Sequence, residues 1–183
     1  MTATQTVAVP LGRYGVDRLH SHFGFAVKHM VVATFRGEFK HIDATLVSTE
    51  DGIRLEGSVP VASISVDHPD LRRHLLSSEF FDVVRSPDIR LVSDDVRIDD
   101  SGAVALYGEL TMKGVTRPLE VRGTLAGPVV DLAGRARLGL ELHAALDRTD
   151  YGLSWNMPLP SGGVAVANEV HLTASLSLLR EDA

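Results

Sequence analysis

The segment that decides the fold class is Val164–Leu178, VAVANEVHLTASLSL. Its even-numbered positions are apolar almost throughout: Val164, Val166, Val170, Leu172, Ala174, Leu176 and Leu178. The odd-numbered positions from Glu169 to Ser177 are polar. A period of two over this length is typical of a long β-strand with one dry side and one wet side. We therefore expect the even-numbered side chains to point into an apolar interior.

The same alternation recurs at Ile53–Val61, Val104–Met112 and Leu138–Leu146, with turn signals such as Asp51-Gly52 and Lys113-Gly114 between the strands. Pro69–Leu76 differs, because its apolar spacing and leading proline predict a short helix with Asp67 as N-cap. Phe25–Val32 fits either a helical turn or an irregular strand. Many strands without a strand–helix rhythm predict an all-β barrel or sandwich. We favour an antiparallel barrel of about eight strands with one or two short helices, since closure removes long strand edges.

Composition limits the possible functions. At 183 residues, without a linker or repeat, the chain is expected to form one domain. A net charge of −6 without a lysine- or arginine-rich cluster argues against nucleic-acid binding. There is no cysteine, and no apolar run approaches the roughly 20 residues of a membrane span. The stretch Met1–Pro10 lacks the features of a secretory signal, so the expected location is cytoplasmic.

Histidines gather near the N-terminus, where His20 and His22 are separated by one residue and His29 follows. Three imidazoles could hold a metal, but the spacing matches no catalytic zinc site and no H-E-x-x-H motif occurs. We favour polar histidines at a cavity mouth or on the surface, and predict no metal site. No G-x-S-x-G, P-loop or G-x-G-x-x-G motif is present, so no catalytic residues are assigned.

All six phenylalanines precede residue 82. They could fill the core, or they could line a cavity, because an eight-stranded barrel is just wide enough to enclose one ligand. Both alternatives stay open. The lining alternative predicts a tunnel formed by Phe25, Met30, Phe35, Phe39, Leu75, Phe80 and Phe81.

A polar end to this tunnel is expected from His20, His22, His29, Arg148 and Asp150. The planar guanidinium of Arg148 suits a phosphate or carboxylate head group. A salt bridge and turn at a strand end is the simpler alternative for Arg148 and Asp150. The lone Trp155 lies a few residues further along the chain.

Five blocks of residues, taken in order, resemble the YceI-like family of polyisoprenoid-binding proteins. They are Tyr14–Met30, Phe35–Phe39, Arg73–Asp82, Gly108–Thr116 and Asp147–Gly152, and the resemblance spans about residues 12–180. Tyr14 stands where the family usually has tryptophan. The resemblance implies a lipocalin-like antiparallel barrel over the single domain 1–183, holding an isoprenoid or a similarly long alkyl chain.

The leading hypothesis is a non-catalytic protein that carries or sequesters a polyisoprenoid, an isoprenoid quinone or a fatty-acid-like lipid. It needs no cofactor besides this ligand, and a homodimer is possible. The expected ligand-binding residues are His20, His22, Phe25, His29, Met30, Phe35, Phe39, His74, Leu75, Phe80, Phe81, Arg148, Asp150 and Trp155. An enzyme acting on a lipid or quinone at the barrel mouth is the main alternative. A filled barrel that serves as an interaction module is the third.

Overall fold

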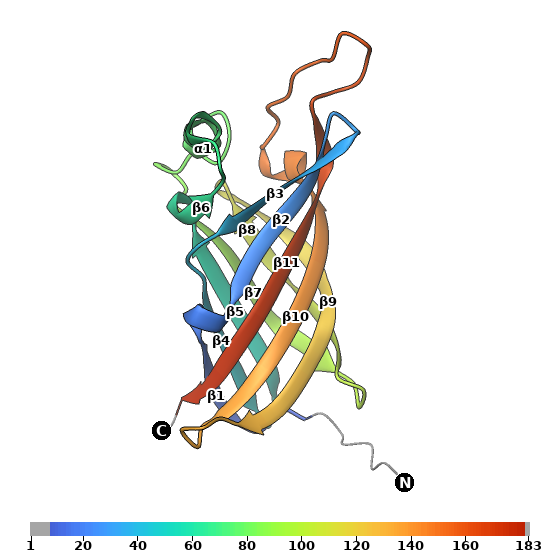
Figure 1. Cartoon of the computed structure of the whole chain (residues 1–183). Coiled ribbons are helices and arrows are strands. Elements are labelled where there is room, and N and C mark those ends of the chain that lie inside the picture. The colour runs from blue at the N-terminus through green and yellow to red at the C-terminus, as the bar shows by residue number, and fades with distance from the viewer. Residues whose placement is uncertain (1–7, 182–183) are drawn as a thin grey trace.

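The computed structural model describes residues 8–181 and consists of a closed antiparallel barrel with a helix at one end (Figure 1). Eight strands form the barrel, and the last of them pairs back with the first. In barrel order they are β1 (Gly12–Val16), β4 (Asp43–Thr49), β5 (Gly52–Pro60), β7 (Asp88–Ile98), β8 (Ala103–Met112), β9 (Val115–Val130), β10 (Ala136–Asp147) and β11 (Val166–Glu181). This arrangement confirms the predicted fold class.

A β-hairpin outside the eight barrel strands extends the wall at one end of the barrel and widens it. It consists of β2 (His22–His29) and β3 (Ala33–Phe39), with the two-residue β6 (Ile64–Ser65) on its outer edge. Strand β11 pairs with β1 through Leu178–Glu181 and with β2 through Val166–Ser175. The wall therefore splits partway along β11, and β2 and β3 form its upper part (Figure 1).

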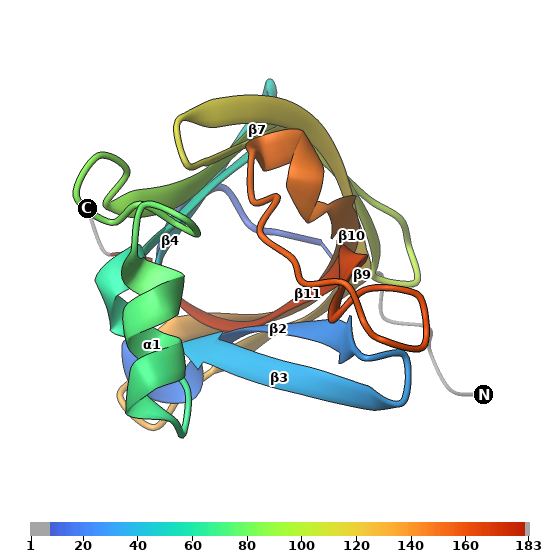
Figure 2. The same ribbon diagram turned by 90° about the horizontal axis from the view of Figure 1, so that it is seen from above.

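The helix α1 (Pro69–Leu76) lies beside this wide end, and the segment that follows β10 lies across from it (Figure 2). Three short 3₁₀ turns complete the elements: η1 (Arg18–His20), η2 (Val61–Ser63) and η3 (Arg148–Tyr151). The predicted helix is confirmed, but its N-cap is His68 rather than Asp67. A residue that precedes proline is held in an extended conformation, so the helix begins at Pro69 itself. The open alternative at Phe25–Val32 is resolved as strand β2 followed by a turn.

The expected alternation in the last strand holds from Val170 to Leu178, where Leu176 and Leu178 are buried. It fails at the start, because Val164 is exposed and Ala165 is buried. Val164 lies before β11 begins, in an isolated β-bridge with Pro158, so the alternation of the strand does not extend to it. The prediction that Val164 points inward is therefore wrong.

The narrow end of the barrel is filled by side chains. Tyr14 and Leu46 face each other on β1 and β4, and Leu138 and Leu178 do so on β10 and β11. All four are completely or almost completely buried. The Tyr14 hydroxyl satisfies its hydrogen bond by donating to the Pro10 carbonyl at 3.0 Å. The opposite, wide end of the barrel is hollow, and it contains the candidate site.

Candidate functional site

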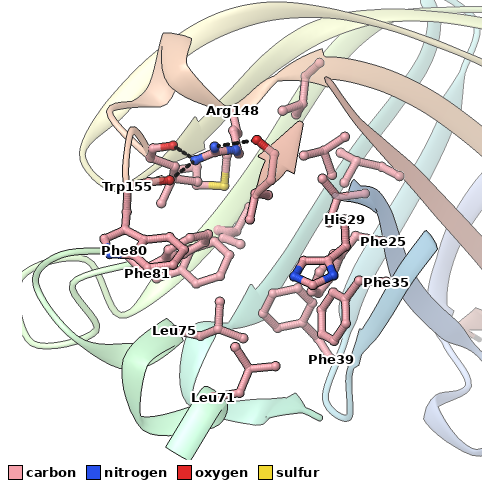
Figure 3. Close-up of a pocket in the computed structure, with 18 of the residues that line it drawn as sticks. Phe25, His29, Phe35, Phe39, Leu71, Leu75, Phe80, Phe81, Arg148 and Trp155 are labelled. Atoms are coloured by element: carbon pink, nitrogen blue, oxygen red, sulfur yellow. Dashed lines mark hydrogen bonds between the residues drawn. The ribbon is translucent and has the colours of Figure 1, made fainter. Parts of the chain in front are cut away.

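A cavity of about 500 Å³ occupies the wide end of the barrel (Figure 3). Its walls come from β2 and β3, from α1 and the residues after it, and from the region around η3 and the start of β11. Apolar side chains make up most of the lining, and they include all six phenylalanines: Phe23, Phe25, Phe35, Phe39, Phe80 and Phe81. The two alternatives for the phenylalanines, core packing and cavity lining, therefore do not exclude each other. Phe39 and Phe81, for example, line the cavity and are also buried in the core.

The aromatic rings form a continuous wall. Phe25 lies 6.1 Å from Phe35 and 5.9 Å from Phe39, centroid to centroid. Phe39 contacts Phe81 edge-on at 6.2 Å, and Phe81 contacts Phe80 at 5.2 Å. Tilted and edge-on rings at these distances are favourable beyond their apolar burial. The wall is thus held by ring–ring contacts and does not need a ligand to define it.

The cavity opens next to the β2–β3 hairpin. His29 and Ala33 line it and are also exposed to solvent, which marks the opening. At its inner end Phe23 and Leu172 also line a second cavity of about 90 Å³, nearer the middle of the barrel. Two apolar cavities with shared lining residues therefore lie between the wide end and the middle of the barrel.

Arg148 lies in the lining but is directed at the protein main chain (Figure 3). Its side chain donates to the carbonyls of Ala167 at 2.9 Å, Trp155 at 3.0 Å and Val166 at 3.3 Å, and also to that of Leu153. The residue is 2% exposed, and burial lowers the pKa of its guanidinium. Four of its five N–H donors are occupied, so Arg148 cannot offer a pair of free N–H groups to a head group.

His74 adds a polar edge between two aromatic rings. Its ring centroid is 4.6 Å from that of Trp155 and 5.9 Å from that of Phe80. Nδ1 lies 3.6 Å from the Glu79 carboxylate, whereas the buried Nε2 has no hydrogen-bond partner among the described residues. A buried nitrogen without a partner costs free energy, which makes His74 unusual in this apolar wall.

Ten of the fourteen sequence-predicted residues lie in the lining: Phe25, His29, Phe35, Phe39, His74, Leu75, Phe80, Phe81, Arg148 and Trp155. The other four, His20, His22, Met30 and Asp150, do not. The expected polar cluster is therefore not assembled, and of its five members only His29 and Arg148 face the cavity.

Each of the four has a physical reason to lie elsewhere. His22 is on the outward side of β2, with Nδ1 3.1 Å from Glu38, because inward positions alternate with it. His20 lies in η1 with Nδ1 2.8 Å from Asp17. Met30 is in the β2–β3 turn, and Asp150 is exposed in η3.

A group of apolar lining residues was not among the residues predicted from the sequence. They come from the inward positions of several strands and from α1: Leu71, Ile89, Leu110, Met112, Leu146, Val170 and Leu172. Most belong to the alternating patterns, so the inward side could be read from the sequence. Which inward residues face empty space could not, because that depends on where the barrel widens.

No group of three or more His, Cys, Asp or Glu side chains between residues 8 and 181 is arranged to hold a metal ion. Among the same residues, no helix has the length and apolarity to cross a membrane.

The family model of the YceI-like domain, compared with this sequence, matches residues 14–178, nearly the whole chain. The chain belongs to the YceI-like family. A UPF0312 protein from Staphylococcus epidermidis is 25% identical over 170 residues, covering 89% of this chain and 95% of that protein. A UPF0312 protein from Pseudomonas putida is 30% identical over 138 residues, covering 75% of this chain and 70% of that protein.

Solved structures share the YceI-like fold. BcnA of Burkholderia cenocepacia has a TM-score of 0.76 at 19% identity, covering 88% of this chain and 98% of that one. A polyisoprenoid binding domain from Saccharophagus degradans has a TM-score of 0.69 at 14% identity, covering 92% and 98%. At these identities the likeness establishes the barrel architecture of this YceI-like chain.

Proposed function

We propose that this YceI-like protein binds a long apolar chain in its cavity and carries or sequesters it without chemical change. The chain would be a polyisoprenoid, an isoprenoid quinone or a fatty-acid-like lipid. The observation that carries the proposal is the apolar cavity, whose volume of about 500 Å³ is typical of ligand sites. The Saccharophagus degradans neighbour, described as polyisoprenoid binding, supports the ligand class.

Burial of the tail would be sufficient for binding. Each methylene group moved out of water contributes about 0.8 kcal/mol, so about ten such groups contribute about 8 kcal/mol. That corresponds to a dissociation constant of about 1 μM before the costs of association are subtracted. Longer tails have more free energy available than binding needs, so the polar side chains need only select the head group.

The polar side chains available for that selection are His29, Thr34 and His74, because main-chain carbonyls occupy four of the five N–H donors of Arg148. The enzyme alternative would require one of them to exchange protons with a ligand. Arg148 is unsuited to this, because its guanidinium remains charged and is held by main-chain carbonyls. No contact in the cavity pairs a nucleophile with a base among the described residues, so a binding role accounts better for the site.

The test is native mass spectrometry of the purified protein, followed by organic extraction and analysis of the extract. A co-purified lipid, with a tail of ten or more carbons and stoichiometry near one, would support the proposal. A protein that is ligand-free and does not take up farnesol, a long-chain quinone or a fatty acid would favour a barrel with another role. The cytoplasmic location expected from the sequence stays a prediction, and the homodimer stays a possibility.

A further inference from the structure

The turn between β2 and β3 carries three exposed apolar residues. Met30, Val31 and Val32 are 43%, 78% and 89% exposed. Met30 and Val31 also have left-handed backbone angles, with φ of 48° and 66°. Two consecutive residues of this kind are normally Asn-Gly, and a β-branched residue such as valine is strained there. The local backbone geometry therefore does not explain why these residues are apolar.

This turn lies beside a second exposed apolar segment. The Met30 N–H donates to the Ala165 carbonyl at 2.8 Å, and the Ala165 N–H donates to the Met157 carbonyl at 2.9 Å. Met157 and Val164 on this neighbouring loop are 57% and 46% exposed. We call Met30, Val31, Val32, Met157 and Val164 the rim patch. Both segments project from the wide end of the barrel (Figure 1).

The rim patch borders the opening of the cavity. His29 and Ala33, the exposed lining residues, directly flank the turn Met30–Val32 in sequence. An exposed apolar cluster of this kind marks a site for a protein or a membrane. Its shape distinguishes the two, because projecting hairpin tips can enter a lipid interface but offer little flat area to another protein.

We propose that the rim patch docks on the surface of a lipid bilayer, so that the cavity opening faces the acyl chains. The inference rests on the proposed function, since a lipid ligand must leave and enter a membrane. Lys28, two residues before the turn, is exposed and makes no ion pair among residues 8–181, so it is available to an anionic lipid head group. The hydrogen bonds from Met30 and Ala165 fix the tips in position before contact.

The experiment measures flotation of the full chain with vesicles of phosphatidylcholine and phosphatidylglycerol. The test variant is Val31→Asn with Val32→Asn, because asparagine tolerates the left-handed conformation at position 31. The matched control is Val130→Asn with Leu132→Asn. These residues are 74% and 110% exposed near the β9–β10 turn, at the opposite end of the barrel (Figure 1).

We expect the wild type and the control variant to float equally, and the test variant to bind at least tenfold more weakly with no fall in its thermal midpoint. Absence of wild-type flotation, or equal flotation of the test variant, would overturn the proposal. So would a test variant that only dissociates a dimer, as sedimentation velocity would detect. Bound lipid is measured in the same samples: if it is retained while flotation fails, only the docking inference is lost.

Discussion

At the residue scale, Gly37 determines the position of one ring of the cavity wall. It faces Phe25 across the β2–β3 pair, and a Cβ atom built on it would lie 2.4 Å from Cζ of that ring. In Gly37→Ala the ring must therefore move, and the cavity is the free space beside it. We expect thermal stability to fall by about 1 kcal/mol and lipid retention in native mass spectra to fall severalfold.

Gly139→Ala is the control for this prediction. A Cβ there would meet only the Ala126 Cβ at 3.8 Å, an ordinary contact, and Gly139 does not line the cavity. This variant should retain lipid as the wild type does. Full retention by Gly37→Ala would show that the Phe25 ring does not limit the space for the ligand.

His74 provides a second prediction at this scale. Its Nε2 is buried without a hydrogen-bond partner in the described part of the chain, so His74→Phe removes a polar group that is costly to bury while filling similar volume. We expect the thermal midpoint of the lipid-free protein to stay constant or rise by a few degrees. If Nε2 contacts a head group, the variant should also lose its preference for a prenyl alcohol over a hydrocarbon of equal length. A fall of several degrees in the midpoint would mean that Nε2 is already satisfied in the lipid-free protein.

At the scale of elements, Arg148 links η3 to the loop that leads into β11. Two of its acceptors, the carbonyls of Leu153 and Trp155, lie in that loop, and the other two, those of Val166 and Ala167, lie at the start of β11. A lysine ammonium is more compact and cannot reach all four carbonyls. Arg148→Lys should therefore lose about 2–3 kcal/mol, lower the thermal midpoint by about 5–10 °C, and expose residues 152–165 to proteolysis.

Arg117→Lys is the matched comparison for this arginine. Arg117 is exposed and donates at 3.4 Å to one main-chain carbonyl, that of Asp150. Its replacement should change stability by less than about 0.5 kcal/mol. An Arg148→Lys protein as stable and protease-resistant as Arg117→Lys would show that the four hydrogen bonds do not hold the loop.

Asp17 connects η1 to β10 and predicts a pH dependence. The Arg137 guanidinium at 2.7 Å, followed by His20 at 2.8 Å, lowers the pKa of this carboxyl to about 2. Because the folded-state pKa lies below that of the unfolded chain, near 3.9, the stabilisation is complete above about pH 5 and is lost as the pH falls toward 2. Asp17→Asn keeps an N-cap acceptor but loses the charge, so it should be about 1–2 kcal/mol less stable at pH 7.

Urea unfolding between pH 2 and pH 7 tests this linkage. The difference between wild type and Asp17→Asn should shrink toward zero as the pH approaches 2. Asp43→Asn is the control, because the ion pair of Asp43 with Arg18 is well exposed and should contribute little. A difference between wild type and Asp17→Asn that stays constant with pH would show that the carboxylate charge is not involved.

At the scale of the whole molecule, the barrel could be predicted from the sequence because period-two alternation is a local property. Leu138, Leu140 and Leu142 on β10, for example, are all buried as the pattern predicts. The positions of the polar side chains could not be predicted, because they depend on which side of a strand each residue faces and on partners distant in sequence. His22 faces outward to Glu38, and Arg148 is taken up by carbonyls of a loop whose path no local pattern encodes.

The contrast between a packed end and a hollow end predicts how the molecule responds to loss of its ligand. Tyr14, Leu46, Leu138 and Leu178 are fully or almost fully buried and do not line the cavity, so side chains alone fill the narrow end. The wide end encloses about 500 Å³ that the protein itself does not fill. A ligand that binds only the folded state stabilises it, by about 2.7 kcal/mol at a hundredfold excess over its dissociation constant.

We therefore expect the extracted protein to remain folded, with a lower thermal midpoint that returns when lipid is added. Amide hydrogen exchange should accelerate in β2, β3 and α1, whose side chains line the cavity, and stay slow in β1 and β4. The measurement compares peptides from the two ends in the extracted and the reloaded protein. Equal acceleration at both ends, or complete unfolding on extraction, would contradict this division, because the narrow end would then depend on the ligand for its own packing.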